Sequence, residues 1–232
     1  MAEFERESIS YQSGGKTYNA YAVRQKESRS SCAVIIAHEI WGLNDDIRNI
    51  ADKFATLGYL ALAPDLYPDR EPPAKIDEAV IKEVLDGAFA EDTLRSLHDA
   101  VGFLGKRFVI APRRTSMAGF CFGGTYALQY VTEFHDLAAA VAFYGRNPPI
   151  ENVPDVVTPV LAFYGAEDRN LVPGIPALTE AFKNAHAYFE VKVYEGAGHS
   201  FMNKHNPGTY VEDAADDAWI MTQAFLKEHL PC

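Results

Sequence analysis

The sequence is poor in basic residues, in cysteine and in long apolar runs, and each deficit excludes a class of protein. Among its 232 residues, Lys and Arg total 21 against 32 Asp and Glu, which gives a formal net charge of −11. Such an acidic chain has no general electrostatic attraction to nucleic acid or to an anionic membrane, so we expect neither as a partner. No stretch approaches the roughly 18 consecutive apolar residues of a membrane span.

Cysteine occurs three times, at positions 32, 121 and 232. An odd number of widely spaced cysteines argues against a disulfide framework and against a Cys-rich zinc site. The first seven residues are acidic and lack the apolar run of a secretory signal peptide. We therefore expect a reduced, cytoplasmic protein whose cysteines at positions 32 and 232 are incidental.

What the chain does contain is ordinary for a globular protein. Hydrophobic residues make up 48% and charged residues 23% of the sequence, which is too apolar for disorder. No linker, internal repeat or low-complexity tract divides it. A single domain over residues 1–232 is therefore expected, a length that one α/β domain commonly has.

Apolar segments alternate with helical patterns along most of the chain. A hairpin is predicted from residues 8–12 and 17–24, and further strands over residues 32–37, 59–64, 116–120, 138–144, 159–164 and 189–194. Helical periodicity, beginning at an N-cap at Asn44 or Asp45, covers residues 47–57, 76–85, 93–104, 124–131, 176–184 and 210–229. This alternation predicts a mostly parallel sheet with helices on both faces. In such sheets ligands bind beyond the carboxyl ends of the strands.

A cysteine stands where one predicted strand turns into a helix. Residues 119–124 read Gly-Phe-Cys-Phe-Gly-Gly, which matches the nucleophile elbow Gly-x-Ser-x-Gly with Cys121 in place of serine. The glycines allow the tight turn, and the start of the following helix favours the reactive thiolate. Cys121 is therefore the candidate nucleophile.

An acid and a histidine follow the next two strands in the chain order that hydrolases use. Asp168 comes directly after the strand over residues 159–164, and His199 lies in the Gly-rich loop after the strand over residues 189–194. A thiol nucleophile needs a base, and the base needs a group that orients it. The order predicts a Cys121–His199–Asp168 triad. The glutaminase arrangement, in which a glutamate follows the histidine by two residues, does not fit because position 201 is Phe.

The loop after the first buried strand, residues 38–44, provides further candidates. Hydrolases take one oxyanion-binding N–H from this loop and one from the residue after the nucleophile. The backbone N–H groups of Ile40 and Phe122 are therefore the expected donors. Glu39 lies at the same sheet edge, where a carboxylate can shift the ionisation of a thiol or accept its proton.

These segments together resemble the dienelactone hydrolase (carboxymethylenebutenolidase) family of α/β-hydrolases, on residues 38–43, 63–67, 119–124, 167–168 and 196–201. The resemblance implies the α/β-hydrolase fold and cleavage of a lactone or ester through an acyl-thioester, without a metal ion or organic cofactor. It also implies that the resting cysteine lies towards Glu39. Substrate binding then moves Cys121 into the triad, and the glutamate assists in forming the thiolate.

The substrate contacts depart from the family pattern. The resemblance implies two arginines for a substrate carboxylate, one after the Pro-Asp-Leu-Tyr motif and one shortly past the His-Ser-Phe motif. Residues 71–90 contain no arginine, and Met-Asn-Lys follows the second motif. The remaining candidate substrate contacts are Trp41, Arg146, Arg169 and Phe201.

Two other functions stay open at this point. One is a carboxylesterase or thiol acyl hydrolase or transferase that acts on another substrate. The other is a non-hydrolytic binding or thiol-sensing module that uses Cys121 as a reactive thiol. As partners we expect a small-molecule lactone or ester, and either a monomer or a homodimer.

Overall fold

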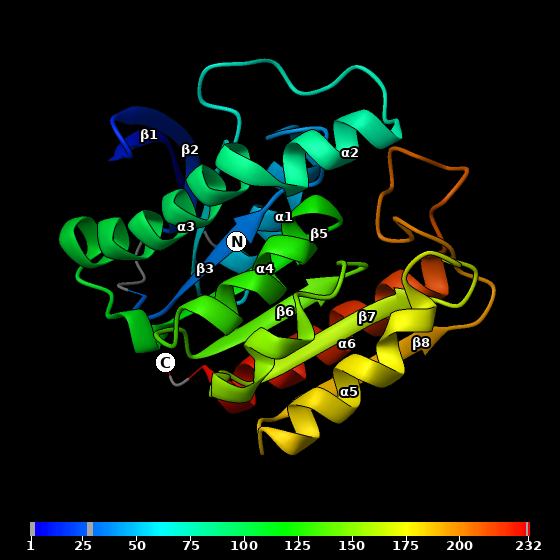
Figure 1. Ribbon diagram of the computed structural model, residues 1–232. Coiled ribbons are helices and arrows are strands. Elements are labelled where there is room, and N and C mark those ends of the chain that lie inside the picture. The colour runs from blue at the N-terminus through cyan, green and yellow to red at the C-terminus, as the bar shows by residue number, and fades with distance from the viewer. Residues whose placement is uncertain (1–2, 27–29, 231) are drawn as a thin grey trace.

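The computed structural model describes residues 3–26, 30–230 and 232, and eight strands of this part form one sheet (Figure 1). The spatial order is β1-β2-β4-β3-β5-β6-β7-β8. The six strands from β4 to β8 run parallel, and the β1–β2 hairpin joins β4 antiparallel. The strands are β1 (Phe4–Ser13), β2 (Lys16–Gln25), β3 (Ala33–Ala37), β4 (Leu60–Pro64), β5 (Thr115–Phe120), β6 (Ala139–Phe143), β7 (Val160–Gly165) and β8 (Phe189–Tyr194).

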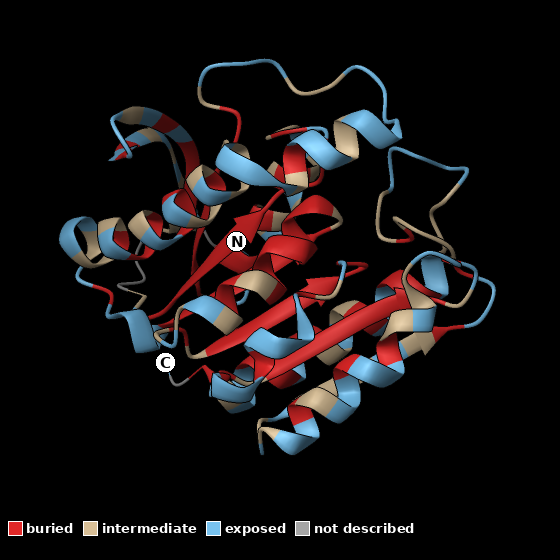
Figure 2. Cartoon of the chain, viewed as in Figure 1, coloured by how far each residue is buried: buried red, intermediate tan, exposed pale blue. Residues whose placement is uncertain are grey.

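Helices cover both faces of this sheet, which confirms the predicted α/β architecture. Helices α1 (Asp45–Thr56) and α6 (Glu212–His229) lie on one face. On the other face lie α3 (Gly87–Phe108), α4 (Phe122–Glu133) and α5 (Ile175–Asn184), and α2 (Glu78–Leu85) packs against α3. Short 3₁₀ turns η1 (Pro112–Arg114), η2 (Ile150–Asp155) and η3 (Val172–Gly174) complete the elements. Figure 2 shows the buried strands between helices that expose only their outer sides.

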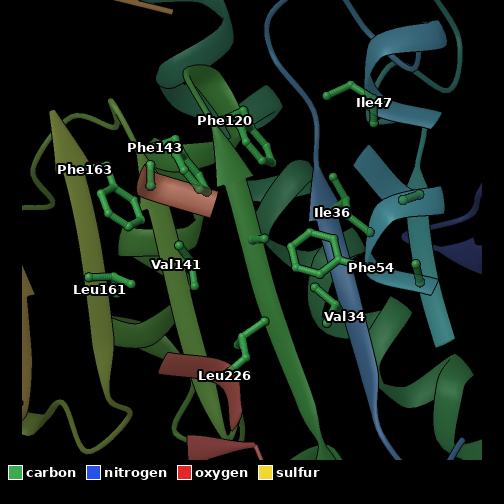
Figure 3. Packing of buried hydrophobic residues seen from close by; sticks show 14 of the residues in the cluster. Val34, Ile36, Ile47, Phe54, Phe120, Val141, Phe143, Leu161, Phe163 and Leu226 are labelled. Carbon is green, nitrogen blue, oxygen red and sulfur yellow. The ribbon is translucent and has the colours of Figure 1, made fainter. Parts of the chain in front are cut away.

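The central strand β3 shows why its sequence is apolar without a break. Side chains alternate between the two faces of a strand, and here both faces are covered. Val34 and Ile36 pack on the α1/α6 side near Phe54 (Figure 3). Ile35 packs on the α3/α4 side near Leu97. All five residues of β3 are therefore buried.

Most predicted element boundaries agree with the structure, and the differences have local causes. Helix α2 begins at Glu78 instead of residue 76 because the Asp77 side chain accepts a hydrogen bond from the Val80 N–H and caps it. Helix α3 begins at Gly87, six residues before the predicted start. These six residues place Phe89 against the rings of Tyr67 and Phe122, a contact that the periodicity of the sequence does not reveal.

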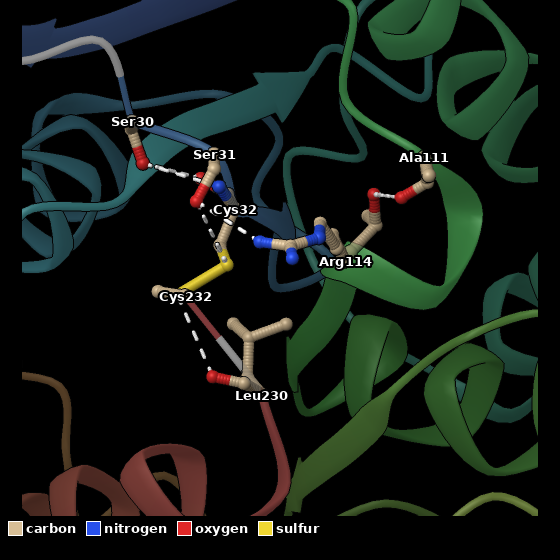
Figure 4. Close-up of a disulfide and its surroundings, with 8 residues drawn as sticks. Ser30, Ser31, Cys32, Ala111, Arg114, Leu230 and Cys232 are labelled. Carbon is tan, nitrogen blue, oxygen red and sulfur yellow. Dashed lines mark hydrogen bonds between the residues drawn. A yellow bond between two sulfur atoms is a disulfide. The ribbon is translucent and has the colours of Figure 1, made fainter.

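The expectation that Cys32 and Cys232 are incidental thiols is wrong, because the two form a disulfide (Figure 4). Cys32 directly precedes β3 and Cys232 follows α6, so the bond joins positions 200 residues apart whose Cα atoms are 5.5 Å apart. Spacing along the chain could not reveal a pair that tertiary structure alone brings together. Cys121 remains as the free cysteine. Disulfides are typical of oxidising compartments, so the cysteine count no longer supports a cytoplasmic location.

Within the described residues, no helix is both long enough and apolar enough to cross a lipid bilayer. Residues 1–2, at the start of the acidic N-terminal stretch, lie outside the described part of the chain.

Candidate active site

Cys121 occupies a strained turn between β5 and α4. Its φ of 54° and ψ of −111° lie in a region that residues with a side chain rarely adopt. The turn is possible because Gly123 has no side chain: a Cβ there would lie 2.0 Å from the carbonyl oxygen of Ala37. The elbow therefore presents the Cys121 side chain at the carboxyl edge of the sheet, as the motif predicts.

The structure brings the three predicted triad residues into contact. The Nε2 atom of His199 lies 3.1 Å from Sγ of Cys121, and its Nδ1 atom lies 2.6 Å from Oδ2 of Asp168. Because a carboxylate accepts, Nδ1–H donates to Asp168 and Nε2 faces the sulfur. The loops that carry the two residues are joined by a bond from the N–H of Glu167 to the carbonyl of Ala197, 2.9 Å long.

The charge state of His199 follows from these contacts. Burial by itself lowers the pKa of this imidazole, but the hydrogen bonds to Asp168 and Cys121 outweigh it and raise the pKa to about 10. An imidazolium at this distance stabilises a thiolate at Cys121. The geometry of the pair therefore suits proton transfer between Cys121 and His199.

Glu39 is buried at the end of β3 and is held by two neutral donors. The hydroxyl of Tyr144 donates to its Oε1 at 3.0 Å, and the side-chain amide of Asn203 donates to its Oε2 at 2.7 Å. Burial raises the pKa of Glu39, and these hydrogen bonds partly oppose that rise. Tyr144 also packs against His199, with ring centroids 5.1 Å apart, so it lies between Glu39 and the triad.

Tyr144 and Asn203 were not identified from the sequence. Tyr144 directly follows β6 at the carboxyl edge of the sheet, which is a signal that could have singled it out. Its φ of 43° is again in the left-handed region, so the backbone is distorted where it presents this hydroxyl. Asn203 lies in the segment after the His-Ser-Phe motif, and its hydrogen bond to Glu39 depends on tertiary structure, which sequence spacing does not reveal.

The two expected oxyanion donors belong to two segments that are in contact, and Phe122 directly follows the nucleophile. In the described part of the chain, neither the Ile40 N–H nor the Phe122 N–H donates to a protein acceptor. Their segments are joined, because the N–H of Gly123 donates to the carbonyl of His38 at 3.0 Å. Ile40, Phe122 and Cys121 all line one cavity.

This cavity has a volume of about 360 Å³, and all three triad residues line it. Apolar side chains from and near α2, among them Ile81, Val84 and Leu85, form one wall. Of the predicted substrate contacts, Trp41 and Arg146 line it.

The other two predicted substrate contacts lie elsewhere. Arg169 is exposed and is not among the residues that line the cavity. Phe201 is fully buried in the core and packs edge-on against Tyr144, with centroids 5.4 Å apart. Its expected role as a substrate contact is therefore corrected: Phe201 supports Tyr144 from within the core.

Glu39 faces a second, smaller cavity of about 120 Å³ between α1 and α6. Tyr144 lines both cavities, whereas Glu39 is not among the residues lining the larger one. Among the described residues no group of three or more His, Cys, Asp or Glu side chains is placed to hold a metal ion.

A mostly parallel sheet whose β5–α4 elbow presents a cysteine to a histidine and an aspartate defines the chain as an α/β-hydrolase. The model of the dienelactone hydrolase family matches residues 18–230, and the chain belongs to that family of hydrolases.

Individual relatives agree with this assignment. The chain is 31% identical over 255 residues to a protein of Saccharolobus solfataricus named "Putative carboxymethylenebutenolidase", covering 94% of this chain and 97% of that protein. A Salmonella typhimurium protein of the same name is 34% identical over 223 residues, covering 89% and 81%. A crystal structure titled "Putative Dienelactone Hydrolase" from Klebsiella pneumoniae matches with a TM-score of 0.87 and 28% identity, covering 97% of this chain and 99% of that one.

Proposed function

We propose that the protein hydrolyses a lactone or small ester through an acyl-thioester on Cys121. The observation that carries this proposal is the placement of His199 between the Cys121 sulfur, at 3.1 Å, and the Asp168 carboxylate, at 2.6 Å. This arrangement is that of a nucleophile, its base and the group that orients the base.

In the acylation step the Cys121 thiolate attacks the substrate carbonyl carbon, and an S–C bond forms while the carbonyl electrons move to oxygen. The N–H groups of Ile40 and Phe122 stabilise that oxyanion. When the carbonyl reforms, the C–O bond to the alcohol breaks and the departing oxygen takes the proton from His199. In a lactone the alcohol stays attached to the acyl group, so no fragment leaves the enzyme at this stage.

In the deacylation step His199 takes a proton from water, and the resulting hydroxide attacks the thioester carbon. Collapse of the second oxyanion breaks the S–C bond and releases the acid. Asp168 keeps the imidazole in the required orientation throughout and stabilises its positive charge.

We assign Glu39 a tuning role through Tyr144 and not through a bond to sulfur. The buried carboxylate binds the Tyr144 hydroxyl, and the Tyr144 ring packs against His199. Charge on Glu39 therefore acts on the Cys121–His199 pair across a short, poorly hydrated distance, where electrostatic effects are strong.

The residues that line the cavity favour a substrate with an apolar part and an anionic group. Apolar residues of α2 line one side, and the exposed Arg146 lines the cavity without an ion-pair partner among the described residues. A guanidinium recognises a carboxylate well because its fork of N–H donors matches the two oxygens. We therefore assign to Arg146 the recognition of a substrate carboxylate, a role for which residues 71–90 provide no arginine.

A panel of small lactones and esters, with and without a carboxylate, tests the proposal. We expect turnover by the wild-type protein and none by Cys121→Ala, whose circular dichroism and thermal midpoint should match the wild type. Absence of turnover across the panel, or full activity of the alanine variant, would refute it. Absence of turnover would instead favour a thiol-sensing module. Adding amine or thiol acceptors to the assay distinguishes hydrolysis from acyl transfer.

A further inference from the structure

His38 lies directly before Glu39, and its imidazole is fully buried with both ring nitrogens hydrogen-bonded. The backbone N–H of Leu66 donates to Nε2 at 2.9 Å. Because a backbone N–H is always the donor, Nε2 carries no proton and Nδ1 carries it. Nδ1–H therefore donates to the backbone carbonyl of Glu39, 2.6 Å away.

Two hydrogen bonds to the Glu39 carbonyl fix the direction of the Ile40 N–H, the one from the His38 imidazole and one from the backbone N–H of Gly42 at 3.1 Å. The Glu39 carbonyl and the Ile40 N–H belong to the same peptide unit, and no cis peptide occurs among the described residues. In a planar trans unit the two groups point in opposite directions. With the carbonyl held by the imidazole at 2.6 Å and by the Gly42 N–H, the Ile40 N–H points away from His38. Ile40 lines the cavity of Cys121. An N–H held in one direction at this cavity is the preorganised donor that an oxyanion needs.

Neighbouring contacts hold the same loop from other sides. The hydroxyl of Tyr67 donates to the carbonyl of Ile40 at 3.0 Å, so the peptide groups on both sides of Ile40 are fixed. The His38 ring stacks with Tyr67 and with Phe122, at centroid distances of 5.5 and 5.7 Å. The loop of His38 therefore packs against Phe122, whose backbone N–H is the other expected oxyanion donor.

The imidazole also stays in one charge state. Burial lowers the pKa of His38 to about 4, so the ring is neutral at neutral pH and its tautomer is set by the Leu66 N–H. His38 has no hydrogen bond to Cys121, Asp168 or His199. It is thus a buried polar group outside the triad whose hydrogen bonds all go to the backbone of the loops around the site.

We propose that His38 is a positioning residue that aims the Ile40 N–H at the oxyanion by holding the Glu39 carbonyl. The inference rests on the proposed thioester mechanism and adds a residue that touches neither substrate nor sulfur. It predicts that losing the Nδ1 donor slows formation of the tetrahedral intermediate. It also predicts no change in thiol chemistry that passes through no oxyanion.

Two amide variants distinguish the hydrogen bond made by Nδ1 of His38 from the one made by Nε2. The amide of His38→Asn falls near the position of Nδ1 and can still donate to the Glu39 carbonyl. The amide of His38→Gln falls near the position of Nε2 and can only replace the bond to Leu66. Tyr67→Phe removes the hydroxyl that holds Ile40 from the other side, and His135→Asn at an exposed histidine is the control.

Each variant is measured for single-turnover acylation of Cys121 by an activated ester, for alkylation of Cys121 by iodoacetamide, and for its thermal midpoint. Alkylation displaces iodide at a saturated carbon and generates no oxyanion. We expect His38→Gln to acylate on the order of 10²-fold more slowly than the wild type, with the rate of alkylation unchanged. His38→Asn should stay within about tenfold of wild type, and Tyr67→Phe should lose acylation but not alkylation.

Equal acylation rates in His38→Asn and His38→Gln would overturn the inference, as would an equal loss of acylation and alkylation. If an amide variant does not fold, Tyr67→Phe decides alone, and unchanged acylation in it counts against the inference. Failure of the proposed mechanism looks different: the wild-type protein itself would then show no acylation of Cys121.

Discussion

The Nε2 atom of His199 lies 3.1 Å from the sulfur of Cys121, although 78 positions separate the two residues. The contact exists because β5 and β8 run parallel and end at the same edge of the sheet. The third member, Asp168, reaches the other side of the imidazole from the loop after β7. Hydrogen bonds to both partners outweigh burial and raise the pKa of His199 to about 10.

Replacing Asp168 with asparagine tests the orientation of this histidine. An amide can donate to Nδ1 and stabilise the tautomer that cannot accept a proton from sulfur, so we expect kcat to fall about 10³-fold. The pKa of His199 should fall as well, because the bond to Asp168 raises it. The measurements are kcat and the pH dependence of Cys121 alkylation. Glu167→Gln, at the exposed neighbour, is the control, and an equal effect in both variants would contradict this role.

The sequence was sufficient to predict the parts of the fold and site that depend on local pattern. Unbroken apolar runs identified the buried strands, and the spacing of glycines around Cys121 identified the elbow. The order of Asp168 and His199 after successive strands was enough to bring them to one edge, because parallel strands place their carboxyl ends together. These inferences need only periodicity and chain order.

What the sequence could not reveal depends on side-chain packing between distant segments. Glu39 and Asn203 are 164 positions apart, and their hydrogen bond follows from how the loops after β3 and β8 meet. Cys32 and Cys232 pair because the ends of β3 and α6 converge. Phe201 shares a motif with His199 but is directed into the core, and motif membership alone could not distinguish these two orientations.

The ionisation of Glu39 should govern the acid side of the pH–rate profile. If its carboxylate is the active form, activity is lost as pH falls through the pKa of Glu39, which burial raises. The Asn203 amide lowers this pKa, so Asn203→Leu should shift the acid limb to higher pH. Glu39→Gln should remove that limb and lower the rate.

The matched control is Asn49→Leu, because Asn49 lines the same small cavity without a hydrogen bond to Glu39. An acid limb at the same pH in wild type, Asn203→Leu and Glu39→Gln would show that Glu39 is a bystander. The profile is measured as kcat/KM, which reports groups of the free enzyme.

Arg146 should discriminate between charged and neutral substrates. Arg146→Met removes the cation from the cavity, and we expect KM for a carboxylate-bearing ester to rise about tenfold, consistent with one charge-assisted contact. KM for the matched neutral ester should hardly change. Arg169→Met serves as the control because Arg169 does not line the cavity. A similar KM change for both esters, or for both variants, would contradict the assignment.

The disulfide should matter for stability and not for catalysis. Cys32 precedes β3, whereas Cys121 follows β5, so the two lie at opposite ends of the parallel strands. Closing a loop of this length typically contributes about 2–5 kcal/mol, and we expect Cys232→Ser to lower the thermal midpoint by roughly 5–15 °C.

Reducing the wild-type protein with dithiothreitol should give the same thermal midpoint as Cys232→Ser, and the reductant should leave that variant unchanged. The value of kcat at 25 °C should be the same in the oxidised wild-type protein and in Cys232→Ser. Identical midpoints for oxidised wild type and Cys232→Ser would show that the bond does not stabilise the fold.

Intact-protein mass spectrometry after a rapid acid quench shows whether an acyl-thioester forms on Cys121. With an activated ester, the wild-type protein should gain the mass of one acyl group. Peptide mapping should place it on the segment that contains Cys121, and hydroxylamine should remove it. Cys121→Ala should show no such adduct. Turnover without a covalent adduct, or an adduct on another residue that forms and decays at the rate of turnover, would rule out a thioester mechanism at Cys121.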